Sequence, residues 1–185
     1  MFRMICLLFS TIFLSTEIIP VFAAPSDQSI TIEARLLNKA EEAQLKSKSL
    51  PYFNDNSLKN KPLWVECKII NNSNEIKEFW SWGCSYGDDW RTDNKAITIL
   101  SWGCDANAPL SYNLQPSESK TLFLPLDITR LSKSAKFHMI FIPYRPSPQD
   151  GFYEIWIKKV SKNSLTGEFW SNELDFNLFE GNLDY

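Results

Sequence analysis

The sequence predicts an all-β protein, an antiparallel β-sandwich of about seven or eight short strands. Short runs that alternate apolar and polar residues recur along the chain, and groups of Asn, Asp, Gly and Pro separate them. The long helical patterns that a parallel α/β sheet requires between its strands do not recur. A closed β-barrel is the alternative arrangement of the same strands.

The first 23 residues have the features of a secretory signal peptide. Arg3 supplies a positive charge, residues 4–14 form an almost uncharged apolar run, and Val21-Phe22-Ala23 places small side chains at the −3 and −1 positions. A transmembrane anchor is the alternative, but Glu17 and Pro20 interrupt the run before the ~20 apolar residues that a span needs. We therefore expect cleavage after residue 23 and a secreted or periplasmic protein without stable membrane insertion.

Residues 24–60 are expected to hold an N-terminal strand and a polar linker, and residues 61–180 to form the sandwich. The first strand is expected over Ser29–Arg35, where apolar and polar residues alternate. Leu37–Lys46 has Leu, Ala and Glu at helical spacing but no clear cap, so a short helix and a loop both fit this segment.

The most regular strand pattern covers Leu63–Ile69, in which Cys67 alternates inward with its apolar neighbours. Asn71–Asn74 is rich in turn-forming residues and predicts a hairpin turn that leads into a second strand over Ile76–Trp82. Ser85–Lys95 is again rich in Gly, Asp and Asn, which predicts turns.

Five further strands are expected towards the C-terminus, at Ala96–Trp102, Lys120–Leu126, Ala135–Ile142, Phe152–Val160 and Phe169–Leu178. Ala135–Ile142 is apolar on both faces, which indicates a central strand. In Phe169–Leu178, alternation with polar residues places Trp170 on the same face as Leu174 and Phe176.

The tetrapeptide Ser-Trp-Gly-Cys occurs twice, at residues 81–84 and 101–104. Each copy ends an expected strand, and a hairpin would bring the two ends together. We therefore favour a Cys84–Cys104 disulfide, permitted by export, although three single pairings among the mature cysteines are possible. Closing a loop of this length would contribute roughly 3 kcal/mol. Cys67 is then expected to be a small buried hydrophobic residue.

Four motifs suggest a resemblance. W-x-W-G-C-S-Y-x-D-x-W begins at Trp80, W-G-C-D-x-N-x-P at Trp102, L-x-P-x-E-S at Leu114 and F-W-S-N-E-L at Phe169. Together with the Asn-rich turn, they resemble small secreted bacterial proteins of unassigned function with an immunoglobulin-like β-sandwich. The likeness covers roughly Leu63–Leu126 and residues 170–174. It implies an immunoglobulin-like fold and export, and it supplies no catalytic residues.

The composition disfavours several classes of function. A formal net charge of −3 without a cluster of Lys or Arg disfavours nucleic-acid binding. His138 is the only histidine, and there is no Gly-x-Ser-x-Gly motif, so we expect no enzyme activity. A small hydrolase that uses His138 and an acid is the alternative. Zinc motifs are absent, and the carboxylates between residues 88 and 107 do not match an EF-hand loop, so neither a metal nor a cofactor is expected.

The aromatic residues of one predicted hairpin are more than a sandwich core easily buries: Trp80, Trp82, Tyr86, Trp90 and Trp102. They could pack around the disulfide as a second core, contact a protein, or stack against sugars beside Asp and Asn. Trp and Tyr are frequent hot spots of protein interfaces. We expect a non-catalytic exported module that binds a protein or acts as an accessory structural domain. A carbohydrate-binding module is the alternative, and the partner is then a glycan.

Overall fold

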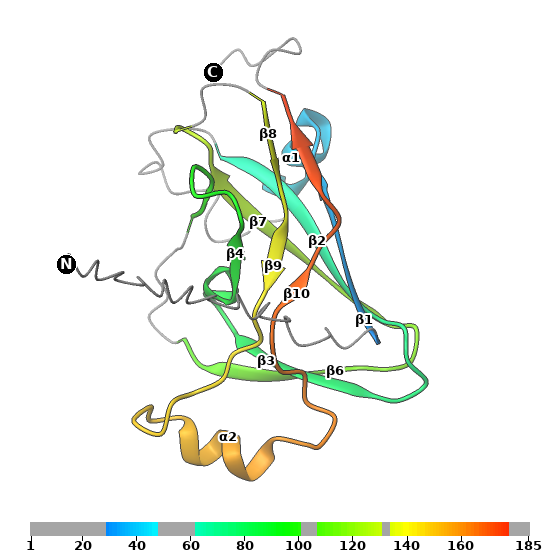
Figure 1. Cartoon of the computed structure of the whole chain (residues 1–185), viewed down its shortest axis with the longest axis vertical. Helices are drawn as coiled ribbons and strands as arrows, with labels where there is room; N and C mark the ends of the chain where they lie inside the picture. Colours follow the sequence, from blue (N-terminus) through cyan, green and yellow to red (C-terminus); the bar gives the residue numbers. More distant parts are fainter. Residues whose placement is uncertain (1–28, 48–61, 101–106, 131–133, 178–185) are drawn as a thin grey trace, which may run out of the picture.

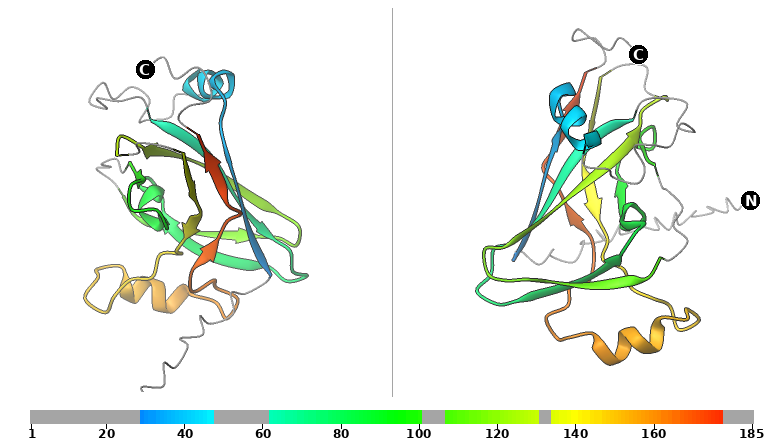
Figure 2. Two further views of the ribbon diagram at one scale, coloured as in Figure 1. Left: turned by 45° about the horizontal axis from the view of Figure 1, so that its top comes forward. Right: turned by 180° about the vertical axis from the view of Figure 1, so that it is seen from behind.

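The structure, a computed structural model, describes residues 29–47, 62–100, 107–130 and 134–177 (Figures 1 and 2). These residues form curled antiparallel sheets with two α-helices, consistent with the all-β class. The signal peptide expected at residues 1–23 lies outside the described residues. In chain order the elements are β1 (Ile30–Leu36), α1 (Lys39–Ser47), β2 (Leu63–Asn71), β3 (Lys77–Trp82), the 3-10 helix η1 (Tyr86–Asp89), β4 (Trp90–Thr92), β5 (Thr98–Ile99), β6 (Pro109–Leu114), β7 (Ser119–Asp127), β8 (Ala135–Phe137), β9 (Met139–Phe141), α2 (Tyr153–Lys159), β10 (Phe169–Trp170) and β11 (Leu174–Phe176).

The longest strands form one sheet in the order β1-β2-β7-β5. β1 buries Ile30, Ile32 and Ala34 and exposes the polar residues between them, which confirms the strand predicted there. β1 pairs along its whole length with β2, whose other edge pairs with β7. The strand expected in residues 24–60 therefore belongs to the same sheet as the strands that follow residue 61.

Helix α1 packs on the side of this sheet where Leu37 and Leu45 bury Trp64. The Asn38 side chain accepts hydrogen bonds from the backbone N–H groups two and three residues further on, both at 3.0 Å. The Glu41 carboxylate in turn accepts the backbone N–H of Asn38 at 2.9 Å. This reciprocal arrangement is a capping box. Of the two alternatives left open for this segment, the helix is therefore the observed one.

The prediction of a β2–β3 hairpin is wrong. β3 pairs with β6 from Lys77↔Leu114 to Trp82↔Pro109, whereas the neighbours of β2 are β1 and β7. The β2–β7 pair therefore continues into the β3–β6 pair through two adjacent connections, and the two-stranded ribbon turns a corner there (Figure 1).

Asn71 is fully buried at this corner. Its side-chain N–H₂ group donates to the carbonyl oxygens of Glu75, Leu114 and Gln115 at 2.8, 2.9 and 3.1 Å. Its side-chain oxygen accepts from the N–H and hydroxyl of Ser73 at 3.0 and 2.7 Å. One amide thus connects the Asn-rich turn with the L-x-P-x-E-S segment, which gives these two sequence features a common structural role.

The second layer contains the sheet β10-β9-β4 and the pair β11-β8. The strand predicted over Ala135–Ile142 is interrupted at His138, which separates β8 from β9. Its partner is interrupted after Trp170, where the Ser171 hydroxyl accepts the N–H of Met139 at 2.9 Å. Before this irregular step the odd-numbered residues of the C-terminal segment face the core, and after it the even-numbered residues do.

The step also corrects the predicted position of Trp170. Phe169, Leu174 and Phe176 are buried, whereas Trp170 is 49% exposed. Trp170 therefore does not share a face with Leu174 and Phe176, as an uninterrupted strand would require.

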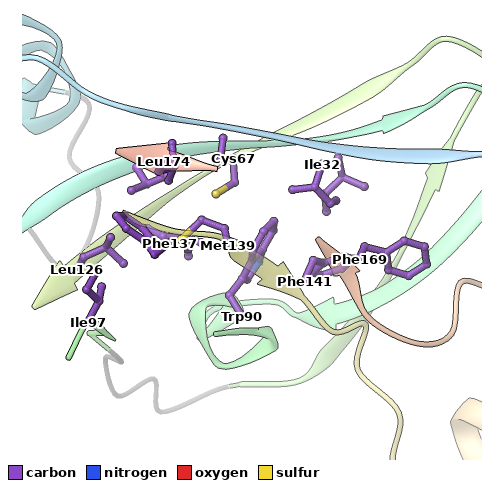
Figure 3. Packing of buried hydrophobic residues seen from close by; sticks show 14 of the residues in the cluster. Ile32, Cys67, Trp90, Ile97, Leu126, Phe137, Met139, Phe141, Phe169 and Leu174 are labelled. Atoms are coloured by element: carbon purple, nitrogen blue, oxygen red, sulfur yellow. The ribbon is translucent and has the colours of Figure 1, made fainter. Parts of the chain in front are cut away.

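The hydrophobic core lies between these two layers (Figure 3). Cys67 of β2 is fully buried and free, which confirms its predicted role as a small buried hydrophobic residue. Burial raises the pKa of its thiol well above the ordinary value. Phe79, Trp90 and Phe169 surround Phe141 with ring-centroid distances of 5.3, 4.9 and 6.4 Å.

Contacts also connect β1 with the C-terminal strands. Ile32 and Ser171 form an isolated parallel bridge. The Asn172 side chain accepts the N–H of Ala34 at 2.8 Å and donates to its carbonyl oxygen at 3.0 Å. Backbone N–H and C=O groups at the edge of the first sheet thereby find hydrogen-bond partners in the second layer.

The strand predicted over Phe152–Val160 is wrong, because Tyr153–Lys159 form helix α2 (Figure 1). Asp150 accepts the N–H of Phe152 at 2.9 Å before the helix begins. Glu154 lies in the first turn and Lys158 in the last, 3.6 Å apart, which favours a helix through both its dipole and an i,i+4 pair.

Candidate functional site

The two Ser-Trp-Gly-Cys copies do not end the two strands of one hairpin. β3 ends within the first copy and pairs with β6, whereas β5 precedes the second and pairs with β7. A strand is predicted over Ala96–Trp102; of its residues that the structure describes, 96–100, Thr98–Ile99 form β5. Cys104 lies outside the described residues, so the Cys84–Cys104 disulfide stays a prediction.

The first copy is nevertheless in contact with residues that follow the second. Gly83 donates its N–H to the carbonyl oxygen of Ala108 at 2.9 Å. The Asn107 side-chain oxygen accepts the N–H groups of Cys84 and Ser85 at 3.2 and 3.3 Å, and its amide nitrogen donates to the Ser85 hydroxyl. The two cysteine motifs therefore meet through Asn107, which orders the loop after β3.

Asp89 is a buried carboxylate below this loop, 5% exposed. It accepts the Ser81 hydroxyl at 2.6 Å and the N–H of Trp82 at 2.9 Å. Burial, together with a smaller effect of the Asp88 charge, raises the pKa of Asp89 to about 6, although the two hydrogen bonds lower it. Asp89 thus holds η1 against β3 and titrates at the edge of the physiological range.

The five aromatic residues predicted as one surface have separate positions. Trp90 lies in the main core, and Trp80 is buried on β3. Trp82 is half-buried, and Tyr86 donates its hydroxyl to the carbonyl oxygen of Phe123 at 3.2 Å. Trp102 lies outside the described residues. Among the described residues, the indole N–H groups of Trp80 and Trp90 are buried without a hydrogen-bond partner.

Trp80 and Trp82 are covered by residues 143–168, which leave the second layer after β9 and return to it at β10. We call this segment the α2 excursion. The ring of Trp82 contacts those of Tyr144 and Phe152, with centroid distances of 4.7 and 6.1 Å. Tyr144 also donates its N–H to the carbonyl oxygen of Trp80 at 2.8 Å. Two predicted surface tryptophans therefore pack beneath another part of the chain.

Polar contacts order the α2 excursion on both sides of its helix. Before the helix, Tyr144 donates its hydroxyl to Asp150 at 2.7 Å; burial and this hydrogen bond raise the pKa of Tyr144. After the helix, the buried Glu78 accepts the hydroxyl of Ser164 at 2.6 Å and the N–H of Ser161 at 3.0 Å. The contacts of Glu78 join the excursion to β3, and helix α2 lies beside the β3–β6 ribbon (Figure 2).

Helix α2 is exposed although it is rich in apolar residues. None of its residues is buried, and Ile155 and Ile157 are 49% and 50% exposed. Between the excursion and β3 lies a groove of about 280 Å³, lined by Trp80, Ile142, Pro143, Tyr144, Arg145, Trp156 and residues 164–168. The Arg145 guanidinium lies 5.8 Å from the centre of the Trp156 ring, a cation–π contact at the rim.

We refer to Ile155, Trp156, Ile157, Arg145 and this groove as the α2 pole. The α2 pole was not predicted, because the apolar residues of 152–160 were expected to form a strand. The available signals were Asp150 before the segment and the opposite charges four residues apart within it.

A second exposed surface lies on the outer side of sheet β10-β9-β4. The exposed Trp170 and the exposed Arg91 are both cross-strand partners of Ile140, on either side of it. Arg91 forms an ion pair with Glu168, and the His138 ring lies 5.8 Å from the Trp170 ring.

His138 is fixed by Asp93. One Asp93 oxygen accepts the backbone N–H of His138 at 2.7 Å, and the other lies 2.9 Å from its Nδ1. Burial alone would raise the pKa of Asp93, but these contacts lower it. An acid on Nδ1 orients an imidazole as a catalytic base requires. In the part of the chain that the structure describes, however, no Ser, Thr or Cys is hydrogen-bonded to the ring.

The described residues contain no group of three or more His, Cys, Asp or Glu side chains placed to hold a metal ion. Among them there is also no helix that is both long and apolar enough to span a bilayer. No model of a known protein family, no curated protein and no solved structure matches the chain.

Proposed function

We propose that this protein is an exported, non-catalytic module that binds another protein through the α2 pole. The observation that carries the proposal is the exposure of Ile155 and Ile157 on a helix that buries none of its residues. Ile155 and Ile157 line a shallow hollow beside Pro148 and Gly151, whereas Trp156 lines the groove. Exposed apolar side chains grouped in this way are typical of interaction sites, whereas single ones are common on any surface.

The residue types of the α2 pole support a protein partner. Trp and Arg, which are enriched at interface hot spots, lie together at Trp156 and Arg145. The groove walls are largely apolar, with charges at the rim, as in protein interfaces. Its volume of about 280 Å³ is below the usual range for small-molecule pockets, so it suits one bulky side chain of a partner.

The charges around the pole indicate an acidic flank on that partner. Arg145, Lys159 and Lys162 are exposed cations without an ion pair among the described residues. The nearby acids are engaged, Asp150 with Tyr144 and Glu154 with Lys158. A partner with an apolar anchor and neighbouring carboxylates would therefore complement this surface.

Export and the finer fold class belong to the same proposal. The N-terminal 23 residues support export, and sequencing the mature N-terminus tests it. Two curled antiparallel layers around one core support the immunoglobulin-like sandwich. The Ile32–Ser171 bridge supports the barrel alternative, because it joins β1 to the second layer. An experimental structure with β1 and β10 paired along their length would favour the barrel.

Site-specific photo-crosslinking tests the α2 pole. A photoreactive residue is placed at position 155, with position 76 as a matched control, because Ile76 is also an exposed apolar residue, 45% exposed. We expect a discrete cross-linked protein from position 155 in the exporting cells, and its loss in an Ile157→Ser background. Ile157→Ser should change the free energy of unfolding by less than about 0.5 kcal/mol, since the side chain is not buried.

Three results would contradict the proposal. One is equal cross-linking from position 76. A second is a cross-linked product that Ile157→Ser leaves unchanged. The third is binding to anionic lipid vesicles, in place of a protein, that depends on Ile155 and Ile157.

One observation favours a small hydrolase as a second candidate, namely the Asp93–His138 contact. His138→Ala distinguishes the candidates: a hydrolytic activity that this variant loses while it remains folded would establish the enzyme. We expect no such activity.

A further inference from the structure

Trp170 is the large aromatic residue that the structure leaves most exposed among the residues it describes. It lies on the outer side of β10, while its neighbour Phe169 is in the core. The step after Trp170 sets this orientation, since Ser171 and Asn172 fasten the chain to β9 and β1 through their side chains. The exposure of Trp170 therefore follows from the fixed backbone around it.

The surroundings of Trp170 are polar. Its cross-strand neighbour Ile140 is only 2% exposed, so the indole ring supplies most of the apolar surface there. Arg91 and Glu168 form an ion pair on this side of the sheet, and His138 contacts the ring itself. We call Trp170, Arg91, Glu168, His138 and Asp93 the Trp170 platform.

The charged groups of the platform have partners of their own. Arg91 forms an ion pair with Glu168, with side chains 51% and 42% exposed, and Asp93 is hydrogen-bonded to His138, both 32% exposed. Arg91 is thus neutralised, and the platform holds no cluster of like charges that would attract a polyanion or a polycation. The exposed ends still provide hydrogen-bond donors and acceptors to an uncharged ligand.

We propose that the Trp170 platform binds a neutral polysaccharide, with one pyranose ring stacked on Trp170. A sugar ring has an apolar C–H face of about the size of an indole and hydroxyl groups around its edge. The apolar face matches Trp170, and the hydroxyl groups match the carboxylates of Asp93 and Glu168 and the guanidinium of Arg91 through charge-assisted hydrogen bonds.

A protein partner fits this surface less well than it fits the α2 pole. A stable protein interface needs about 800 Å² on each side and an apolar centre. The platform has a single exposed indole with charged residues around it. Carbohydrate binding was considered above for the aromatic residues between 80 and 102. We now place it at Trp170, which lies outside that segment.

Affinity electrophoresis of the mature chain through gels that contain a soluble neutral polysaccharide tests the proposal. The probes are a β-1,4-glucan, a β-1,3-glucan, an α-1,4-glucan and a xylan, with polygalacturonate as the charged comparison. We expect at least one neutral polymer to retard the protein, and polygalacturonate not to do so. Trp170→Ala should weaken this retardation about tenfold or more, because it removes the stacking surface.

Two further variants keep the test interpretable. Trp170→Phe retains a ring and should retain most of the binding, which separates stacking from a loss of folding. Ile76→Ala removes an exposed apolar side chain elsewhere and should leave binding unchanged. The proposal is overturned if none of the four neutral polymers retards the protein, if only polygalacturonate does, or if Trp170→Ala and Ile76→Ala have the same effect. The platform and the α2 pole have Glu168 in common, but Trp170 belongs only to the platform and Ile155 and Ile157 only to the pole, so either proposal can fail alone.

Discussion

The buried Asp89 allows a specific prediction about stability and pH. In the folded protein its pKa is about 6, against an ordinary value of 3.8. A carboxyl group whose folded pKa is raised stabilises the folded state fully below its unfolded pKa, and this contribution disappears as the pH rises through 6. The difference between the two pKa values corresponds to roughly 3 kcal/mol.

Asp89→Asn removes the titration and keeps an oxygen that can accept from Ser81 and Trp82. We therefore expect the stability of Asp89→Asn relative to the natural sequence to increase by about 2–3 kcal/mol between pH 4 and pH 8. The lowered pKa values of Glu78, Asp93 and Asp127 give the opposite trend, but both proteins share it, so it cancels in the difference.

Urea unfolding followed by tryptophan fluorescence at several pH values measures this difference. Asp88→Asn is the matched control, because Asp88 is the exposed neighbour of Asp89 and its replacement should change the pH dependence much less. A difference between the Asp89→Asn protein and the natural sequence that is independent of pH, or that decreases towards pH 8, would refute the reasoning.

Three other substitutions test the connections that shape the fold. Glu78→Gln should destabilise by about 1–3 kcal/mol and increase tryptic cleavage after Lys158 and Lys159, because Glu78 accepts three hydrogen bonds that hold the β3–β6 ribbon and the α2 excursion together; unchanged cleavage in limited proteolysis would contradict this. Gly83→Ala should cost about 1–3 kcal/mol in urea unfolding, since its Cβ would lie 2.9 Å from Leu110 Cδ1 and 3.1 Å from a backbone carbonyl oxygen; a neutral effect would mean that the loop can shift. Asn71→Ala should be the most harmful of the three, with a loss of roughly 3 kcal/mol or more in the same assay, because it leaves carbonyl groups at the corner without their donor; a loss smaller than that of Gly83→Ala would argue against this role of Asn71.

Local sequence patterns were sufficient to predict a strand and its buried face where the strand is continuous and only one of its faces is buried. β1 alternates as the sequence predicts, and Cys67 lies in the core as expected. Residues 152–160 show the opposite case. Their apolar residues fit both an alternating and a helical pattern, and in the described structure this segment has no strand beside it. Its backbone hydrogen bonds are therefore made within a helix.

The candidate sites could be predicted only in part. An excess of aromatic residues was evident from the sequence, but which of them are exposed was not. Trp80 and Trp82 are covered by the α2 excursion, and Trp90 enters the core, because each packs against residues more than 40 positions away. Trp170 is exposed because the irregular step that follows it interrupts the strand. The alternation of its own segment would have placed it on the face that points to the core.

By itself, the sequence determined the all-β class and the buried face of β1 and β2. These features depend on alternation, which is a property of neighbouring residues. The turns were predicted less well, because Asn71–Asn74 does not close a hairpin of β2 and β3, and Ser85–Lys95 contains strand β4. Only the tertiary structure decided that β3 pairs with β6, that the α2 excursion covers Trp82 of β3, and that the α2 pole and the Trp170 platform lie on different elements. Those outcomes depend on contacts such as Lys77 with Leu114, far apart in the sequence, for which a single chain carries no local signal.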